Sequence, residues 1–455
     1  MTEQAKDRGA QAPGTATRIP SDWLERAERH ELLVGILGLG YVGLPLGLAF
    51  CEAGFRVLGF DVDDGKVSTL NQGRSYIEHL ETERVGGVVE KGLFEATADF
   101  DRLSEPDALL ICVPTPLDEH RQPNLTYVEK TATEIAARLR PGQLVILEST
   151  TYPGTTDGLV QPILDRAGLA CGEEYFLAFS PEREDPGNLE FGTTGIPKVV
   201  GGVTPEATAM ALALYDDVFA GTVEVSSARV AEASKLTENI FRAVNIALVN
   251  ELKVVFDSMD IDVWEVLDAA ATKPFGFMRF TPGPGWGGHC IPVDPFYLTW
   301  KAREFGQTAR FVELAGEVNV EMPRYVIAKL QRALNDASKA IKGSKILVLG
   351  LAYKPDIADP RESPAFEILD HLFELGADVC YHDPFIPKSP RMRTWPRLPT
   401  MESVTLDAET LASQDAVLLI TNHRSIDYEM VLEHASLIID TRGVYRRPDP
   451  KVVKA

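Results

Sequence analysis

The sequence predicts an α/β protein with two Rossmann-like, doubly wound domains joined by a long central helix. Three observations predict this fold. A strand, glycine turn, helix and strand pattern fills residues 31–63, a helical pattern free of Gly and Pro starts near residue 228, and a strand followed by glycine recurs from residue 342. With 455 residues, the chain is long enough for two or three domains with their own cores.

Composition narrows the class of protein. Hydrophobic residues make up 45% and charged residues 25%, as in an ordinary globular protein, and the net charge of 45 − 67 = −22 disfavours nucleic acid or anionic membranes as partners. The five cysteines are scattered without metal-ligand or disulfide spacing, so no metal site is expected and a reducing cytoplasm fits best. No run of 18 apolar residues occurs, so we expect no membrane insertion.

The first domain is predicted over residues 31–225, after a flexible lead-in at 1–30. Apolar runs at 107–116 and 142–154 end in turns rich in Pro, Thr and Ser. Buried parallel strands end in this way at the carboxyl edge of a sheet.

Residues 38–43, "GLGYVG", follow a strand and open a helix, and an acidic residue ends the next strand 18 residues later. Glycines in this context allow a tight turn and close approach of a pyrophosphate to the helix N-terminus, while the acid bonds a ribose hydroxyl and repels a 2′-phosphate. The pattern therefore predicts NAD binding rather than a glycine turn without a ligand. The residues expected at the cofactor are Gly38, Gly40, Tyr41, Val42, Gly43 and Asp61, with Lys66 either at the adenosine end or simply solvated.

A central helical region is predicted over residues 226–335. Apolar residues at three- and four-residue steps indicate one long amphipathic helix, in which Lys235 and Asn239 share a face. Lys235 is either a solvated lysine or, pointing into a cleft, a group that stabilises an oxyanion.

The stretch 283–295, "GPGWGGHCIPVDP", surrounds Cys290 with glycines and places His289 and Asp294 nearby. An isolated cysteine is commonly inert packing. Beside a nicotinamide cofactor, however, a cysteine can take an aldehyde through a thiohemiacetal to a thioester. The local residues leave both interpretations open.

The second α/β domain is predicted over residues 336–455. Its strands echo the first domain, and basic residues follow strand ends at Lys354, Arg361 and Arg442, which suggests an anionic nucleotide. In the first domain, the charged loop 178–188 with Glu182 and Arg183 is either solvent-exposed or at a ligand.

Seven motifs together resemble the UDP-glucose/GDP-mannose dehydrogenase family over about residues 31–445: "GLGYVGLPLG", "CVPTP", "ESTTYPGTT", "SPERE", "ASKLTENIFRAVNIALVNEL", "GPGWGGHCIPVDP" and "GLAYKPDIADPRESP". The resemblance implies an N-terminal NAD-binding domain, a central dimerising helix and a C-terminal domain for a UDP-sugar. It also implies oxidation of a sugar C6 hydroxymethyl to a carboxylate with two NAD and no metal.

By motif, the resemblance implies Cys290 as nucleophile, Lys235 as oxyanion stabiliser, Asn239 and Asp294 around the water, Thr150 as holder of the water, and Glu182 as acid/base. Further cofactor contacts are implied at Thr115, Thr150 and Arg361. Substrate contacts are implied at Glu182, Arg183, Lys235, Asn239, Arg279, Gly287, Lys354 and Arg442. Relatives carry a second glutamate where this chain has Pro186, flanked by Glu184 and Asp185, and their arginine donated across the dimer is matched by either Lys273 or Arg279.

The stretch 273–302 is most similar to the branch that acts on UDP-N-acetylhexosamines, above all UDP-N-acetylglucosamine. A UDP-glucose or UDP-N-acetylmannosamine dehydrogenase, a two-electron β-hydroxyacid dehydrogenase and a non-catalytic sensor of NAD or nucleotide sugar are the alternatives. The NADH released per sugar separates these classes: two, one or none.

Overall fold

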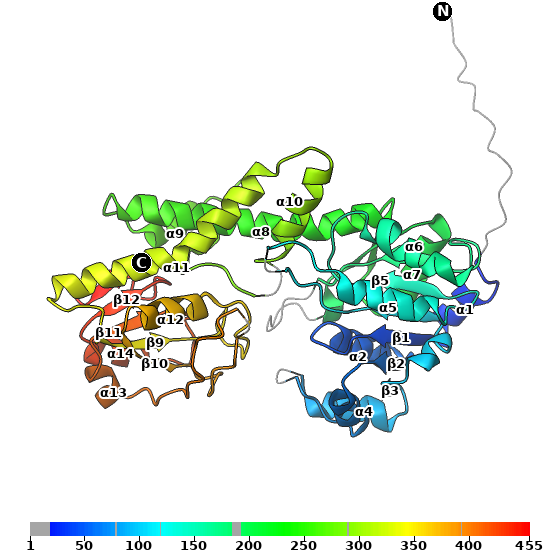
Figure 1. Ribbon diagram of the computed structural model, residues 1–455, viewed down its shortest axis with the longest axis horizontal. Helices are drawn as coiled ribbons and strands as arrows, with labels where there is room; N and C mark the ends of the chain where they lie inside the picture. Colours follow the sequence, from blue (N-terminus) through cyan, green and yellow to red (C-terminus); the bar gives the residue numbers. More distant parts are fainter. Residues whose placement is uncertain (1–18, 78–79, 119, 184–192, 289–290, 393) are drawn as a thin grey trace, which may run out of the picture.

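Two α/β lobes joined by long helices form the computed structural model of the chain (Figure 1). The structure describes residues 19–77, 80–118, 120–183, 193–288, 291–392 and 394–455. Both lobes are Rossmann-like and a long helix, α8, connects them, so the predicted fold class is confirmed.

The amino-terminal lobe is built on an eight-stranded sheet in the order β3-β2-β1-β4-β5-β6-β7-β8. Its strands are β1 (Leu33–Leu37), β2 (Arg56–Phe60), β3 (Phe94–Thr97), β4 (Ala108–Ile111), β5 (Leu144–Leu147), β6 (Phe176–Phe179), β7 (Lys198–Gly202) and β8 (Thr222–Glu224). Neighbours pair in parallel except β6 and β7, which are antiparallel. The central strands are buried throughout, which explains their uninterrupted apolar sequences.

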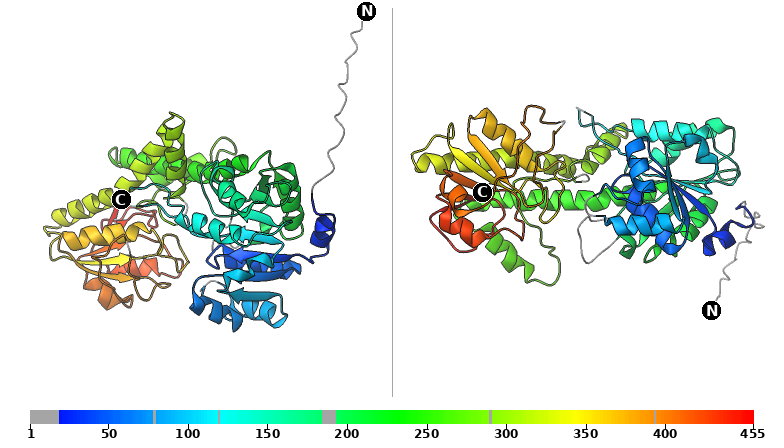
Figure 2. Two further views of the ribbon diagram at one scale, coloured as in Figure 1. Left: turned by 45° about the vertical axis from the view of Figure 1, so that its right-hand side comes forward. Right: turned by 90° about the horizontal axis from the view of Figure 1, so that it is seen from below.

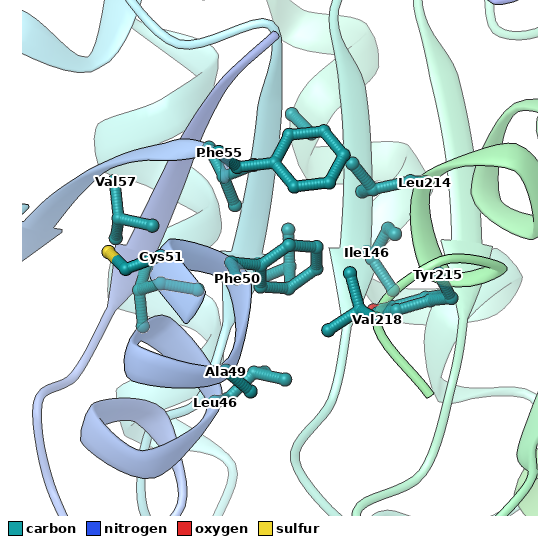
Figure 3. Close-up of a cluster of buried hydrophobic side chains, with 14 of the residues drawn as sticks. Leu46, Ala49, Phe50, Cys51, Phe55, Val57, Ile146, Leu214, Tyr215 and Val218 are labelled. Atoms are coloured by element: carbon teal, nitrogen blue, oxygen red, sulfur yellow. The ribbon is translucent and has the colours of Figure 1, made fainter. Parts of the chain in front are cut away.

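Helices cover both faces of this sheet. They are α2 (Gly43–Ala53), α3 (Asp64–Asn71), α4 (Thr82–Glu90), α5 (Thr126–Ala136), α6 (Gln161–Leu164) and α7 (Pro205–Tyr215), with a π-helical turn at Thr156–Val160 before α6. On one face α2, α4 and α7 pack against the strands, and Figure 3 shows Phe50 of α2 beside Tyr215 and Val218. On the other face α5, α6 and the start of α8 pack.

The predicted lead-in 1–30 is too long at its carboxyl end. Residues Trp23–Glu28 form a helix, α1, in which Trp23 is only 2% exposed and packs on the first core. Arg26 of α1 also pairs with Asp107 at 2.6 Å. Short amphipathic helices are hard to detect from periodicity because one turn carries only one or two apolar residues. Residues 1–18 lie outside the described residues.

Four helices form the central region: α8 (Ala228–Asp257), α9 (Val263–Ala271), α10 (Asp294–Glu304) and α11 (Arg310–Asp336). Ser227 caps α8 by accepting a hydrogen bond from Val230 N, and α8 then runs for 30 residues from one lobe to the other (Figure 2). Helix α11 packs along α8 and leads into the second lobe (Figure 1).

The carboxyl-terminal lobe has a five-stranded parallel sheet in the order β10-β9-β11-β12-β13. Its strands are β9 (Lys345–Leu349), β10 (Asp378–His382), β11 (Ala416–Leu419), β12 (Ile438–Asp440) and β13 (Val452–Lys454), and its helices are α12 (Pro364–Glu374), α13 (Ala408–Ala412) and α14 (Tyr428–His434). Helices α11 and α12 cover one face, and α13 and α14 cover the other. Among the described residues, no helix has the length and apolar character needed to cross a membrane.

Candidate active site

The glycine turn after β1 has the shape of a pyrophosphate cradle. Gly38 has φ +95°, a conformation that favours glycine, and its N–H donates to Phe60 O at 2.8 Å. A Cβ on Gly43 would lie 1.9 Å from Gly38 O, so only glycine fits where α2 begins. A Cβ on Gly40 would meet nothing within 4 Å, which leaves open space beside the turn.

Asp61 follows β2 at the edge of this cradle and is largely buried. Its carboxylate accepts hydrogen bonds from Leu39 N and Asp63 N, both at 3.0 Å, and lies 3.4 Å from Lys66 Nζ. Tyr41 and Val42 lie in the turn between Gly40 and α2. The residues therefore fit a dinucleotide, with backbone N–H groups at the start of α2 for the pyrophosphate and Asp61 for the ribose.

Four predicted site residues lie close together: Glu182, Lys235, Asn239 and Asp294. In the sequence they span 112 positions, from Glu182 to Asp294. Asn239 Nδ2 donates to Asp294 Oδ2 at 2.5 Å, and Lys235 Nζ donates to the backbone carbonyl of Glu182. Helix α8 presents Lys235 and Asn239 on its buried face, α10 begins at Asp294, and Glu182 follows β6. The predicted shared face of Lys235 and Asn239 is thus a buried one.

Asp294 is only 3% exposed. Burial raises the pKa of its carboxyl to about 6, although the Lys235 charge and the Asn239 hydrogen bond oppose the rise. A carboxyl with this pKa exchanges a proton near neutral pH, as an acid or base in a reaction must.

Thr150 follows β5 on a loop that also contacts α8. Glu232, fully buried and three residues before Lys235, accepts hydrogen bonds from Gly154 N at 2.5 Å, Thr156 N at 2.8 Å and Thr156 Oγ1 at 2.7 Å. Burial raises the pKa of Glu232 to about 7, against the hydrogen bonds of Thr156 and Gly154. The same helix therefore carries Lys235 and holds the Thr150 loop.

Thr115 lies on the loop after β4, and its carbonyl accepts a hydrogen bond from Tyr297 of α10 at 2.9 Å. A neighbouring contact joins the lobes: the Arg361 guanidinium lies 4.1 Å from the centre of the Tyr41 ring. Gly288 N donates to Arg361 O at 3.2 Å, so the segment that carries Arg361 touches both the glycine turn and the loop that leads to Cys290.

Arg442 and Gly283 are in close contact, since a Cβ on Gly283 would lie 2.5 Å from Arg442 Nη1. Burial lowers the pKa of Arg442 to about 10. Lys253 Nζ donates to Gly283 O at 2.9 Å, and burial together with the Arg442 charge lowers its pKa to about 7. These two basic side chains at one glycine, Lys253 buried and Arg442 partly buried, would favour an anionic ligand. Lys354 is partly buried in the same lobe.

Three predicted basic contacts have carboxylate or ring partners. Arg183 pairs with Glu238 of α8 at 2.7 Å, and Arg279 pairs with Asp268 of α9 at 2.6 Å. Lys273 Nζ lies 4.9 Å from the centre of the Phe275 ring. The structure thus gives Arg183 and Arg279 a role in holding loops against the central helices.

Cys290 and His289 lie outside the described residues, as do Glu184, Asp185 and Pro186. Their described neighbours are placed: Gly287 is partly buried, and its Cβ would lie 2.9 Å from Glu362 O. The roles expected for Cys290 and for the other site residues stay predictions. Within the described ranges, no group of His, Cys, Asp and Glu forms a metal site.

Sequence reasoning missed three buried groups beside the site: Glu232, Glu148 and Lys198. Glu148 ends an apolar strand and Lys198 opens another, and Glu232 precedes Lys235 by one helical turn. A charged residue at the end of a buried strand needs a partner of opposite charge. This signal could have identified Glu148 and Lys198, which pair with each other.

Comparison with known proteins gives a consistent picture. Three domains of the UDP-glucose/GDP-mannose dehydrogenase family match in order: the NAD binding domain at residues 32–219, the central domain at 229–321 and the UDP binding domain at 347–447. The NAD binding domain match agrees with the predicted cofactor.

Two relatives cover most of the chain. A UDP-N-acetyl-D-glucosamine 6-dehydrogenase of Pseudomonas aeruginosa is 38% identical over 80% of this chain and 86% of the relative. A UDP-N-acetyl-D-mannosamine dehydrogenase of Escherichia coli is 36% identical over 91% of this chain and 99% of the relative. Among solved structures, the UDP-D-ManNAc dehydrogenase of Pyrococcus horikoshii has a TM-score of 0.84 and 30% identity, covering 93% of this chain and 98% of that one. The chain belongs to the UDP-glucose/GDP-mannose dehydrogenase family and is an NAD-dependent nucleotide-sugar dehydrogenase.

Proposed function

We propose that this enzyme oxidises the C6 hydroxymethyl of a UDP-N-acetylhexosamine, UDP-N-acetylglucosamine first among them, to the uronate. The overall reaction consumes one water and two NAD and yields the carboxylate, two NADH and three protons. The observation that carries the proposal is the buried cluster in which Asn239 bonds Asp294 and Lys235 bonds the Glu182 backbone. Asp294 of this cluster follows Cys290 by four residues in the sequence.

The glycine turn and Asp61 would hold NAD, which would supply the hydride acceptor for both oxidations of the sugar C6. The Lys235 ammonium stabilises negative charge that develops on the C6 oxygen. Cys290 adds to the resulting aldehyde, and the second oxidation converts the thiohemiacetal to a thioester on its sulfur. Water then opens the thioester.

Hydrolysis needs a held water and a group that exchanges a proton. Thr150 binds the water, and Glu182 takes its proton as the C–O bond forms and returns one to the leaving Cys290 sulfur. Asn239 and Asp294, bonded to each other beside Lys235, orient the water and the ionisable groups around it. The raised pKa of Asp294 suits a carboxyl that shares a proton within the cluster.

The choice of sugar rests on the relatives, because the P. aeruginosa protein is named for UDP-N-acetylglucosamine and the E. coli protein for UDP-N-acetylmannosamine. We therefore propose to incubate the enzyme with NAD and each of UDP-N-acetylglucosamine, UDP-N-acetylmannosamine and UDP-glucose, and to count the NADH per sugar. Two NADH with UDP-N-acetylglucosamine preferred supports the proposal. One NADH, none, or Cys290→Ser retaining full activity contradicts the mechanism.

We further propose that α8 forms a homodimer contact. Phe241, Leu248 and Val255 recur every seven residues on α8 and are exposed, with Leu248 51% exposed. These three residues form an exposed apolar face of α8, separate from the buried face that carries Lys235 and Asn239. Buried in a dimer, this face would be removed from water. Sedimentation of wild type and of Leu248→Glu tests this, because a dimer predicts dissociation of the variant.

A further inference from the structure

Glu148 and Lys198 form a fully buried ion pair beside the candidate active site. Lys198 Nζ lies 2.5 Å from Glu148 Oε2, and the two side chains are 3% and 0% exposed. The Tyr215 hydroxyl donates to the other carboxylate oxygen of Glu148. None of these three residues has a part in the proposed chemistry.

The pair joins two strand ends that precede predicted site residues. Glu148 directly follows β5 and stands two residues before Thr150. Lys198 Nζ also donates to Pro181 O at 3.0 Å, and Pro181 directly precedes Glu182. One ammonium therefore fixes the positions of the two segments that carry Thr150 and Glu182.

The antiparallel direction of β7 explains how Lys198 comes to lie at the edge of the sheet where β5 and β6 end. Residues of β6 and β7 pair as Ala178 with Gly202 and Phe179 with Gly201. Continued past the end of β6, this register places Lys198 opposite Glu182. A parallel strand would begin at the other edge of the sheet, whereas the reversed one begins where β5 and β6 end.

The Lys198 ammonium interacts electrostatically with Glu182 as well as with Glu148. Burial disfavours the Lys198 ammonium, but the charges of Glu148 and Glu182 hold its pKa above the ordinary value. Burial raises the pKa of Glu148, and Lys198 opposes that rise. Glu182 Oε1 accepts a hydrogen bond from Arg183 N at 2.7 Å, while Oε2 is buried and has no hydrogen-bond partner among the described residues. The unpartnered oxygen is available to a water molecule.

We propose that Glu148 and Lys198 are positioning residues for thioester hydrolysis, which fix Glu182 relative to Thr150 so that both contact one water. The inference rests on the proposed function. The pair makes no direct contact with Lys235 or the glycine turn in the described structure; it holds the Pro181 carbonyl, and Lys235 bonds the next carbonyl, that of Glu182. The two oxidations should therefore be slowed much less than hydrolysis, in which Glu182 and Thr150 act directly, because a shift of about 1 Å in a reacting group can cost about 100-fold in rate.

The test compares the double variant Glu148→Leu/Lys198→Met with wild type. Removing both charges avoids an unpaired buried charge, so the protein should still fold. With NAD and UDP-N-acetylglucosamine, stopped flow should show a full burst of two NADH per site. The steady-state rate should then fall at least about tenfold, and intact-mass analysis should show an acyl adduct on the enzyme. The KM values for NAD and sugar should fall together with the steady-state rate because the acyl enzyme accumulates, so kcat/KM should change less than about twofold.

The matched control is Arg26→Met, which breaks the Arg26–Asp107 pair at the opposite edge of the same sheet. It should lower the melting temperature and leave the ratio of burst rate to steady-state rate unchanged. Lys198→Arg, which keeps the charge, should recover part of the lost hydrolysis rate. If the double variant slows burst and hydrolysis equally, or slows neither, the positioning role is wrong.

A second variant covers the case in which the double variant does not fold. Tyr215→Phe keeps the ring packed against Phe50 (Figure 3) and removes only the hydrogen bond to Glu148. Its steady-state rate should fall several-fold with an unchanged burst, and an unchanged ratio overturns the proposal. If wild type releases two NADH through a Cys290 adduct while these variants are normal, only the positioning role fails. If wild type forms no adduct, the proposed function itself fails.

Discussion

Each lobe begins with a strand and a tight turn, and in each lobe the turn donates a hydrogen bond to the acidic residue that follows the neighbouring strand. In the amino-terminal lobe Leu39 N donates to Asp61 Oδ2 at 3.0 Å, and in the carboxyl-terminal lobe Leu351 N donates to Asp383 Oδ2 at 2.7 Å. The strand orders also correspond, with β2-β1-β4-β5 in one lobe and β10-β9-β11-β12 in the other. The loose sequence echo between the halves thus reflects a shared core.

The acids of the two turns differ in their remaining partners. Asp61 lies at the edge of an open cradle beside Lys66. Asp383 is enclosed: besides Leu351 N, the N–H groups of Ala352, Phe385 and Ile386 donate to its carboxylate. His423 Nε2 lies 3.1 Å away, and the side chains of this pair are fully buried. An acid whose acceptor sites are used within the protein has none left for a ribose.

The turns themselves also differ. Where the first lobe has Gly40 and Gly43, the second has Ala352, which is buried, and Pro355. Helix α2 starts at Gly43, but α12 starts only at Pro364, well beyond the turn. The first lobe therefore offers backbone N–H groups to a pyrophosphate, whereas we infer that the second lobe binds its nucleotide through loop side chains such as Lys354 and Arg442.

The largest expected effect is a difference in the free energy of unfolding when Asp383 or Asp61 is replaced by alanine. Asp383→Ala leaves buried N–H donors and His423 without their acceptor, so the free energy of unfolding should fall by about 3–5 kcal/mol. Asp61→Ala removes the acceptor of two backbone N–H groups beside the open turn and should cost only about 1–2 kcal/mol. Urea unfolding at pH 7 measures both. Equal losses would mean that Asp383 is no more structural than Asp61.

The next effect contrasts the pH dependence of Asp383 and Asp294. Burial alone would raise the pKa of Asp383, but His423 and backbone donors lower it, so its stabilisation is complete above pH ~4 and is lost only in stronger acid. For Asp294, with a pKa of about 6 in the folded state, the stabilisation is complete below pH ~4 and is lost as the pH rises to about 6.

Asp294→Asn should therefore become more stable relative to wild type by on the order of 2–3 kcal/mol between pH 4 and pH 7, while activity falls. Urea unfolding at these two pH values, with NADH release at pH 7, measures both effects. A constant stability difference across this range would show that the folded protein does not perturb Asp294.

A smaller effect concerns the cofactor. Asp61→Asn removes a negative charge that repels a 2′-phosphate, so the preference for NAD over NADP should shift by about tenfold, equal to about 1.4 kcal/mol. Dissociation constants from NADH and NADPH fluorescence give the ratio. Asp383→Asn is the matched control and should leave it unchanged. A ratio that changes in Asp383→Asn and not in Asp61→Asn would mean that NAD binds the carboxyl-terminal lobe, and the assignment made here would be wrong.

Local signals explain what the sequence predicted well. The glycine turn, Asp61 and the shared face of Lys235 and Asn239 depend on residues a few positions apart. The structure has the turn between β1 and α2, Asp61 bonded to it, and the two α8 residues on one buried face. The strand ends that carry Glu182 and Lys354 also followed from runs of buried residues.

Long-range partners could not be predicted in the same way. Glu148 and Lys198 are 50 residues apart, and their contact exists only because β7 is antiparallel. The resemblance implies a substrate contact for Arg183, and no local pattern indicated that its side chain also pairs with Glu238 of α8. Pairing of charges between elements depends on how the elements pack, which no local pattern encodes.

The smallest expected effect tests the open space at Gly40. Gly40→Ala adds a Cβ where no protein atom lies within 4 Å, so folding stability should change by less than about 1 kcal/mol. The same methyl group enters the space predicted for the pyrophosphate, so the dissociation constant for NAD should rise several-fold, about 1 kcal/mol.

Ala352→Gly makes the reciprocal change in the second lobe. It removes one buried methyl group and should cost about 1 kcal/mol of stability, with no effect on the affinity for NAD. Thermal unfolding and NADH fluorescence titration of both variants give the four values. If Gly40→Ala bound NAD as tightly as wild type, the open space beside the turn would not be where the pyrophosphate lies, and the contrast between the lobes would rest on Asp61 and Asp383 alone.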